Sequence, residues 1–479
     1  TNLGEHKLQV SGLVDKRNRY DNSYYSYAVK DYVDLSTLNE SLIEPFVVHD
    51  TKEAKNQTAL RFTINNDSRS VLAYDVSLSH QETRSHQVQL GINSTALHEA
   101  TIKNTAVNAQ VDIHDVYLRL SHSKGENRVP VFEPFNYDES VTQSILEYEY
   151  QLPQWRIRPG IAYDEIKYDA EFIGGERTLR NKAAMLRIDH QPNSKLRFVS
   201  ALRFDDYNVP ADNYFSYQFL GTLKSGANTV FRLGIERAHR SPFIVERYVD
   251  IEVINPNFPS VQSNFIGDAE MDLTTIFTVE LGLRHQFSFN NWIGVELFHS
   301  QLKDFVNPIN TGTEIVPPLA IITNQYQVLP TKSEQLGFTL NWEYEALDWD
   351  LDVFLTAQKT EIEDQFTSLV EPLSLSDTDD KGTPSFYGGF NMNWRPEEKW
   401  SFNSNLYYMH DYDFKLKQPQ GEQNFQNWFT LNLKMTHHYS KLLDLHLALR
   451  NLSNRDQSQY FRSDIIEPIL LFGFDMQFY

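Results

Sequence analysis

The sequence contains no cysteine among its 479 residues. Disulfides and thiolate metal sites are therefore excluded. It also lacks any apolar run approaching the roughly 18 residues of a membrane-spanning helix, and its mean hydropathy is negative. Two classes remain: a water-soluble all-β protein, and a transmembrane β-barrel, whose half-polar strands escape hydropathy tests.

Cationic charge is scarce as well. The chain has 43 Lys and Arg against 64 Asp and Glu, a formal net charge of −21. Such a chain repels a phosphate backbone, so we expect no nucleic-acid partner. The motifs GxxxxGK[ST], HExxH and GxSxG are missing, and His437 and His438 would point to opposite faces of a strand. We therefore expect neither an enzyme nor a bound cofactor or metal.

Aromatic residues are plentiful, at 13% of the chain with 25 Tyr and 31 Phe. This content suits the aromatic girdles of a membrane barrel. Apolar and polar residues also alternate in one stretch after another. In residues 429–436, Phe, Leu, Leu and Met alternate with Thr, Asn, Lys and Thr, and in 443–450 four Leu alternate with Asp, His, Ala and Arg. Period-two alternation places one set on each face of a strand.

Short turns, such as residues 191–194 and 224–227, alternate with long polar connections. We expect the long connections to be irregular and to comprise residues 19–54, 239–272, 305–332 and 364–384. Short turns on one rim and long loops on the other are typical of outer-membrane barrels. About 20 strands of roughly ten residues can be counted, and closure would leave no unpaired edge in lipid. We predict an all-β fold, one large antiparallel transmembrane β-barrel domain over residues 1–479.

Several stretches resemble the barrel of TonB-dependent receptors. Arg240-Ser241-Pro242 resembles the family's Arg-x-Pro segment, and Asn255-Pro256-Asn257 resembles its Asn-Pro loop, although Phe258 replaces the usual Leu. Residues 449–455, LRNLSNR, resemble its Asn-Leu-x-Asn-Lys element. These matches follow the family's order from residue 195 to the end of the chain. The resemblance implies a barrel of about 22 strands.

The last residues are similar to the C-terminal signal that the barrel-assembly machinery reads. Gly473, Met476 and Phe478 fit this assembly signal, with Tyr479 as one extra residue. The family's barrel follows a plug domain with a short box that contacts TonB. Nothing in the 479 residues resembles either, and a strand pattern already begins at Leu8. We expect the plug to be absent from this chain.

Two groups of residues are candidates for function. Charged side chains recur on the polar faces of consecutive strands, where they would line the lumen and could form a cross-strand ladder: Arg197, Arg203, Arg232, Glu236, Glu280, Arg284 and Glu296. In the family such residues hold the plug; without a plug they would set the electric field in a pore. A second group in one long connection could stack on an extracellular ligand, or serve loop packing and interface anchoring: Tyr20, Tyr24, Tyr25 and Tyr27.

The resemblance implies a location in the outer membrane of a Gram-negative cell, in contact with lipid and lipopolysaccharide. It implies TonB-driven uptake of a bulky, scarce nutrient: a siderophore, a cobalamin-like cofactor, an oligosaccharide or a peptide. Two alternatives stay open. One is a plugless pore or conduit whose lumen is filled or gated by a partner protein, and the other is a structural or adhesion barrel at the cell surface.

Overall fold

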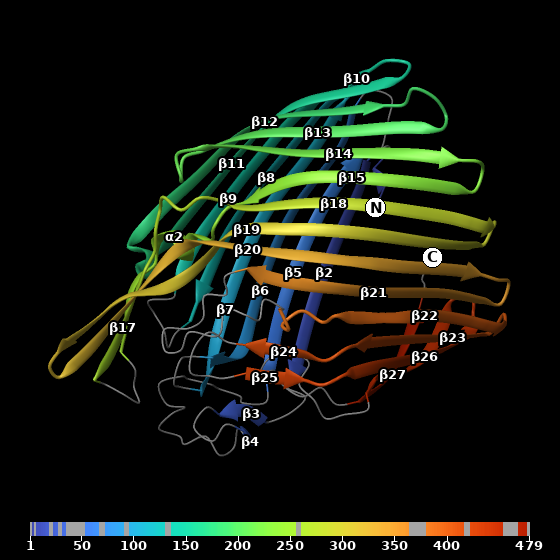
Figure 1. The fold of residues 1–479 in the computed structure, drawn as a ribbon. Helices are drawn as coiled ribbons and strands as arrows, with labels where there is room; N and C mark the ends of the chain where they lie inside the picture. Colours follow the sequence, from blue (N-terminus) through green and yellow to red (C-terminus); the bar gives the residue numbers. More distant parts are fainter. Residues whose placement is uncertain are drawn as a thin grey trace.

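In a computed structural model, the chain forms one large, curled β-sheet (Figure 1). The structure describes residues 2–3, 6–18, 23–26, 31–34, 53–66, 72–90, 95–129, 136–254, 260–363, 380–415, 422–453 and 468–476. All statements below on what the structure contains refer to these residues.

The main sheet has 24 strands. Four of them, β1, β10, β16 and β17, are short additions, and the other twenty form the wall of the barrel. Each wall strand pairs antiparallel with the next one along the chain, from β2 to β28. The wall curls round, so that β2 to β8 lie behind β13 to β21 (Figure 1). The predicted large antiparallel barrel is confirmed.

The wall strands are β2 (His6–Asn18), β5 (Glu53–Asn66), β6 (Leu72–Leu90), β7 (Thr95–Ile113), β8 (Val116–Arg128), β9 (Tyr137–Tyr148), β11 (Trp155–Ala170), β12 (Gly175–His190), β13 (Leu196–Tyr207), β14 (Asn213–Ser225), β15 (Thr229–Arg240), β18 (Thr274–Ser288), β19 (Asn291–Val316), β20 (Leu319–Glu345), β21 (Trp349–Glu363), β22 (Phe386–Glu397), β23 (Trp400–Met409), β26 (Trp428–Ser440), β27 (Leu443–Ser453) and β28 (Ile469–Met476). The smaller elements are β1 (Asn2–Leu3), β3 (Ser23–Ser26), β4 (Asp31–Asp34), β10 (Tyr150–Gln151), the 3-10 helix η4 (Glu171–Ile173), α2 (Ile244–Tyr248), β16 (Asp250–Ile254), β17 (Val261–Ile266), β24 (Tyr412–Lys415) and β25 (Glu422–Phe425).

The two faces of the wall differ in chemistry. Leu233, Leu281 and Leu297 lie side by side on β15, β18 and β19, and they are 47%, 51% and 51% exposed. Such large apolar side chains in a contiguous exposed belt mark a surface that meets an apolar medium. We call this side the apolar face. The alternate residues, Glu280 among them, form the polar face.

Aromatic rings gather near the short-turn rim of the apolar face. Trp349 and Trp394 are directly opposed on β21 and β22. The Trp349 ring lies 4.9 Å from the Tyr344 ring, and the Trp394 ring lies 5.4 Å from the Phe402 ring. This is the belt expected where a barrel meets the membrane–water interface. No helix within the described ranges has the length and apolarity needed to cross a bilayer.

The prediction of an irregular connection over residues 305–332 is wrong. There β19 and β20 continue as a long hairpin, paired as far as Val316 and Leu319. The stretch contains Pro308 and Gly312, and proline and glycine commonly interrupt strands. Beyond Lys303, however, β18 no longer accompanies β19, and an edge strand tolerates proline and a bulge. The register of β19 against β20 indeed shifts between Asn310 and Gly312.

The connection over residues 239–272 is also more ordered than predicted. It contains α2 and the hairpin of β16 and β17, and β17 pairs in parallel with the outer half of β20. A small core forms where this connection meets η4, built on Ala170, Phe172, Ile173 and Val249. Burying these apolar side chains fixes the connection onto the rim.

The C-terminal strand shows why glycine occupies position 473. A Cβ added at Gly473 would lie 2.3 Å from Nε2 of His446 on the neighbouring strand. On the opposite face, Phe472, Phe474 and Met476 are 75%, 63% and 48% exposed. The alternation expected of the assembly signal is therefore present in β28. Phe478 lies outside the described residues.

We predict that Gly473→Ala destabilises the barrel by about 1–3 kcal/mol, because the methyl group must displace the His446 ring. The measurement is the midpoint of denaturant unfolding in lipid vesicles. The double variant Gly473→Ala/His446→Ala removes the displaced ring and should recover most of the loss. Equal instability of the single and double variants would contradict this explanation.

Candidate functional site

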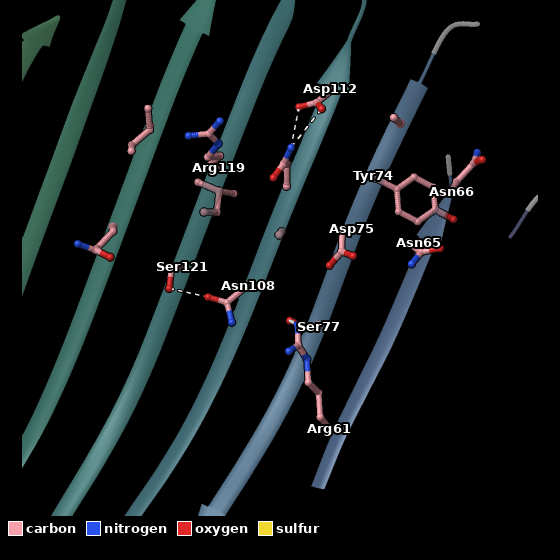
Figure 2. A pocket seen from close by; sticks show the side chains of 16 residues that line it. Arg61, Asn65, Asn66, Tyr74, Asp75, Ser77, Asn108, Asp112, Arg119 and Ser121 are labelled. Atoms are coloured by element: carbon pink, nitrogen blue, oxygen red, sulfur yellow. Dashed lines mark hydrogen bonds between the residues drawn. The ribbon is translucent and has the colours of Figure 1, made fainter. Parts of the chain in front are cut away.

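A cavity of about 600 Å³ opens on the polar face across β5 to β9. Figure 2 shows the polar side chains that line it, contributed by consecutive strands. They lie near the short-turn rim, because Asn66 ends β5 and Asp112 precedes the turn from β7 to β8. Strict alternation brings them together, since every second residue of each strand points to the same side.

The cavity wall carries charges of both signs. Within the described ranges, Asp75 and Arg119 make no ion pair, and the side-chain oxygen of Asn65 is buried without a hydrogen-bond partner. Ser77 is only 2% exposed, and its oxygen lies 3.5 Å from Nη2 of Arg61. Buried polar groups normally find partners. The cavity is therefore suited to a polar occupant that offers both donors and acceptors.

The wall also contains satisfied pairs that hold its shape. The Ser121 hydroxyl donates to Oδ1 of Asn108 over 2.8 Å, and the Gln110 amide donates to Oδ2 of Asp112 over 3.2 Å (Figure 2). The first bond links β8 to β7. The second links Gln110 to Asp112, two residues further along β7. They leave Arg119 and Asp75 available for another molecule.

A second polar cluster lies on β15, β18 and β19. Nη2 of Arg232 is 2.7 Å from Oε2 of Glu280 and 3.1 Å from Oε2 of Glu296. Gly282 stands directly between Arg232 and Glu296 in the register. Its missing side chain leaves room for the guanidinium to reach both carboxylates. The structure thus brings together three of the seven charged residues singled out in the sequence.

The other four charged candidates have separate partners. Arg197 pairs with Asp189, with Nε 2.9 Å from Oδ1. Arg203 lies with Nε 2.8 Å from Oδ1 of Asp205. Glu236 accepts a hydrogen bond of 3.0 Å from Gln218. The guanidinium carbon of Arg284 lies 3.9 Å from the centre of the Trp292 ring, a cation–π contact. The seven residues therefore do not form one continuous ladder.

Sequence reasoning missed the acidic partners of the arginines. Asp164, Asp189 and Asp205 share the polar face with Arg203 and Arg197. Asn181 and Asp205 are 7% and 4% exposed, and they share a hydrogen bond of 2.7 Å. Each of these polar residues could be recognised in the sequence, because it stands at an alternating position of a predicted strand. Which residues meet depends on strand register, which only the structure supplies.

Of the four tyrosines proposed as ligand contacts, Tyr24 and Tyr25 lie on β3, which pairs with β4. Tyr20 and Tyr27 lie outside the described residues. His437 and His438 contact different partners: the backbone oxygen of Lys399 at 3.2 Å, and Oδ1 of Asp444 at 2.8 Å. Across the described ranges, no three His, Asp or Glu side chains are grouped to hold a metal ion.

At the outer rim, Arg247 of α2 is almost fully buried, at 1% exposed. Its Nη1 donates to the backbone oxygen of Ala269 over 2.7 Å, and burial lowers the pKa of its guanidinium. A Cβ on Gly267 would lie 2.5 Å from the backbone of Arg247. This close approach lets residues 267–269 fold back over α2. The arrangement gives the β15–β18 connection one defined position on the rim.

A curled antiparallel wall with an apolar outer belt and a charged polar face defines an outer-membrane type of transport barrel. The family model described as "TonB dependent receptor-like, beta-barrel" matches residues 5–452, and the chain belongs to this family. The resemblance noted in the sequence is thereby confirmed. Members of the family are transport receptors rather than enzymes, and they are outer-membrane proteins that act with TonB.

Solved structures support the same fold. A mutant of the ferric enterobactin receptor PfeA from Pseudomonas aeruginosa is 12% identical, with a TM-score of 0.67 over 83% of this chain and 64% of that chain. The siderophore receptor PirA from Acinetobacter baumannii is 11% identical, with a TM-score of 0.67 over 83% and 66%. The copper transporter OprC is 11% identical, with a TM-score of 0.64 over 93% and 69%. No curated protein matches the sequence.

This chain thus spans 64% of the length of the first of these receptors. At such low identity, the likeness extends to the fold and not to the ligand.

Proposed function

We propose that this barrel lies in the outer membrane of a Gram-negative cell and serves TonB-driven uptake of a bulky, scarce nutrient. Family membership supports this proposal. The similar structures are a ferric enterobactin receptor, a siderophore receptor and a copper transporter. A metal chelate is therefore the first substrate class to test, ahead of a cobalamin-like cofactor, an oligosaccharide or a peptide.

The observation that carries the proposal is the polar face. A barrel with about twenty strands is too wide for its own side chains to fill. An aqueous lumen of this width would leak solutes unless another element occupied it. We propose that a plug fills it, from the same polypeptide or from a separate chain, and that Arg61, Asp75 and Arg119 bind that plug near the short-turn rim.

The residues singled out in the sequence take roles within this proposal. The Arg232–Glu280–Glu296 cluster would line the lumen at mid-strand and contact the plug or the passing ligand. The tyrosines at positions 20, 24, 25 and 27 would contact the ligand from outside, since ring faces stack on sugars and aromatic chelates.

Uptake tests the proposal directly. Cells carrying the complete protein are grown under iron limitation and supplied with labelled ferric chelates, and the labelled iron retained by the cells is measured. We expect the retained iron to fall to background when the gene is deleted. The same loss is expected when TonB is absent, because import against a gradient needs its energy.

The control is the deletion strain carrying the gene on a plasmid, which should recover uptake only when TonB is present. Uptake that persists without TonB would contradict energised transport. If ferric chelates are not imported, the same assay with cobalamin, oligosaccharides and peptides identifies the substrate class. Failure of all four classes would refute the uptake proposal.

A further inference from the structure

The polar face of β22 and β23 carries two neighbouring rows of amides. Asn391 on β22 lies directly opposite Asn405 on β23, and the next row toward the short-turn rim pairs Asn393 with Asn403. The Asn405 amide donates to Oδ1 of Asn391 over 2.7 Å, and the Asn403 amide donates to Oδ1 of Asn393 over 3.0 Å. We call these four residues the amide rows.

The amides use only part of their hydrogen-bonding capacity on one another. An asparagine offers two N–H donors and a carbonyl oxygen with two lone pairs. Among the described residues, the Asn391 amide nitrogen and the Asn405 carbonyl oxygen make no hydrogen bond, and both side chains are half-buried. The rows therefore present donors and acceptors side by side, which is the pattern that a hydroxyl group needs.

Two aromatic rings adjoin the amide rows on the same face. Phe354 on β21 and Tyr407 on β23 both lie opposite Gly389 of β22. Their ring centres are 6.1 Å apart, and Tyr407 is 40% exposed. A Cβ at Gly389 would lie 3.2 Å from Cε1 of Phe354 and would collide with the backbone oxygen of Leu406. Glycine therefore lets the two rings approach across β22. We call Phe354 and Tyr407 the aromatic pair.

A further row of large side chains follows toward the outer rim. Tyr387 lies opposite Met409, and Met409 lies opposite Trp428. The indole N–H of Trp428 is buried and has no hydrogen-bond partner in the part of the chain that the structure describes, although buried indoles usually find one. The polar face thus carries a column of contacts, from Trp428 through the aromatic pair to the amide rows. Successive levels are two residues apart, about 7 Å along the strand.

This column fits a ring that is apolar on its faces and hydroxylated at its edge. Aromatic side chains stack on the faces of sugar rings, and amides bond hydroxyls both as donors and as acceptors. A sugar unit stacked on the aromatic pair would reach the nearest amide row. Anions are disfavoured, because Asp352 beside this row is directly opposite Glu343, and neither carboxylate has an ion-pair partner within the described ranges.

We infer that the aromatic pair and the amide rows bind a neutral oligosaccharide on the lumen wall. The inference rests on the proposed transport function and makes it more specific. It names the oligosaccharide as the substrate class, and it names β21 to β23 as the part of the wall along which the substrate passes.

The test is equilibrium dialysis of the complete protein in mild detergent against labelled maltohexaose, cellohexaose and chitohexaose. Hexaglycine, a peptide with the same number of units, is dialysed in parallel. We expect at least one hexasaccharide to bind and hexaglycine not to bind. The variants Phe354→Ala/Tyr407→Ala and Asn391→Leu/Asn405→Leu should each weaken sugar binding about tenfold or more.

The matched control is Phe390→Ala/Tyr408→Ala. It also removes one phenylalanine and one tyrosine, but from the apolar face of β22 and β23, where Phe390 lies opposite Leu406 and Tyr408 lies opposite Gly388. Sugar binding should be unchanged in this control. Tyr407→Phe keeps the ring and should bind like the wild type. Circular dichroism checks that every variant remains a barrel.

A second measurement locates the sugar without removing any contact of the aromatic pair. The chain has no cysteine, so a single cysteine can be labelled with a water-soluble maleimide. Asn432 lies opposite Asn405 on the polar face, and Leu433 is the next residue, on the apolar face. Saturating sugar should slow the labelling of Asn432→Cys and leave that of Leu433→Cys unchanged.

Three results would overturn the inference: no binding of any hexasaccharide, wild-type binding by the Phe354→Ala/Tyr407→Ala variant, or equal weakening in the control. Labelling of Asn432→Cys that ignores bound sugar would also overturn it, because the sugar would then lie elsewhere. Binding in detergent needs no TonB, so failure of energised uptake leaves the site intact. Failure of the site leaves the uptake of chelates open, and the two proposals therefore fail separately.

Discussion

Replacing Leu281 by arginine is expected to destabilise the barrel by about 2–4 kcal/mol, the cost of a charge on the lipid side of a barrel near mid-membrane. Leu281 lies at the centre of β18, is 51% exposed, and neighbours Leu233 and Leu297 on the adjacent strands. In water, an exposed leucine could accept this change almost without effect. The size of the loss of stability therefore shows whether lipid or water covers this face. The measurement is the equilibrium denaturant midpoint in lipid vesicles.

The matched control is Thr278→Arg, three residues earlier on the same strand. Thr278 lies on the polar face, directly opposite Glu236 of β15, so the new charge meets water and a carboxylate. We expect a change below about 1 kcal/mol. Equal losses for the two variants would show that the faces do not differ in solvent. A larger loss for Thr278→Arg would reverse the assignment of the faces.

Reversing two charges in the polar cavity is expected to release the proposed plug from the lumen. Arg61 and Arg119 both line the cavity across β5 to β9 (Figure 2). Truncating one partner of a buried charge pair costs roughly 2–5 kcal/mol. In the variant Arg61→Glu/Arg119→Glu, plug occupancy should therefore fall about 100-fold or more. Planar-bilayer recordings of the complete receptor should change from silent to steadily conducting.

The conservative variant Arg61→Lys/Arg119→Lys keeps both charges and should stay nearly silent. A silent Arg61→Glu/Arg119→Glu variant with normal folding would mean that the plug does not depend on this cavity. A wild-type receptor that already conducts steadily would show that nothing blocks the lumen. That second result would favour a passive pore over energised uptake.

Much of the wall was predictable because period-two alternation survives in nearly every strand. The runs ending at Met435 and Leu449 specify which side chains share a face, and their short turns specify antiparallel neighbours. The hairpin tip at Pro317 and Pro318 was not predictable in the same way. Proline, glycine and asparagine in that stretch favour a loop locally. The parallel pairing of β17 with β20 overrides this preference.

The candidate site was predictable only in part. Alternation placed Arg232, Glu280 and Glu296 on one face, but the ion pairs depend on the register that follows the long β15–β18 connection. The cavity around Asp75 and Arg119 was missed, because its lining residues come from five strands, β5 to β9. Which of these residues meet depends on the pairing register of the five strands, and that register cannot be read from one strand at a time.

The central claim is that one face of this wall meets lipid and the other meets water. The absence of cysteine makes a direct measurement feasible, because single cysteines carrying spin labels can be placed without background. Labels at Val279, Leu281 and Leu283 should be accessible to oxygen dissolved in the bilayer, and labels at Thr278, Glu280 and Gly282 to a water-soluble nickel chelate. Uniform accessibility along β18, or the opposite alternation, would contradict the account.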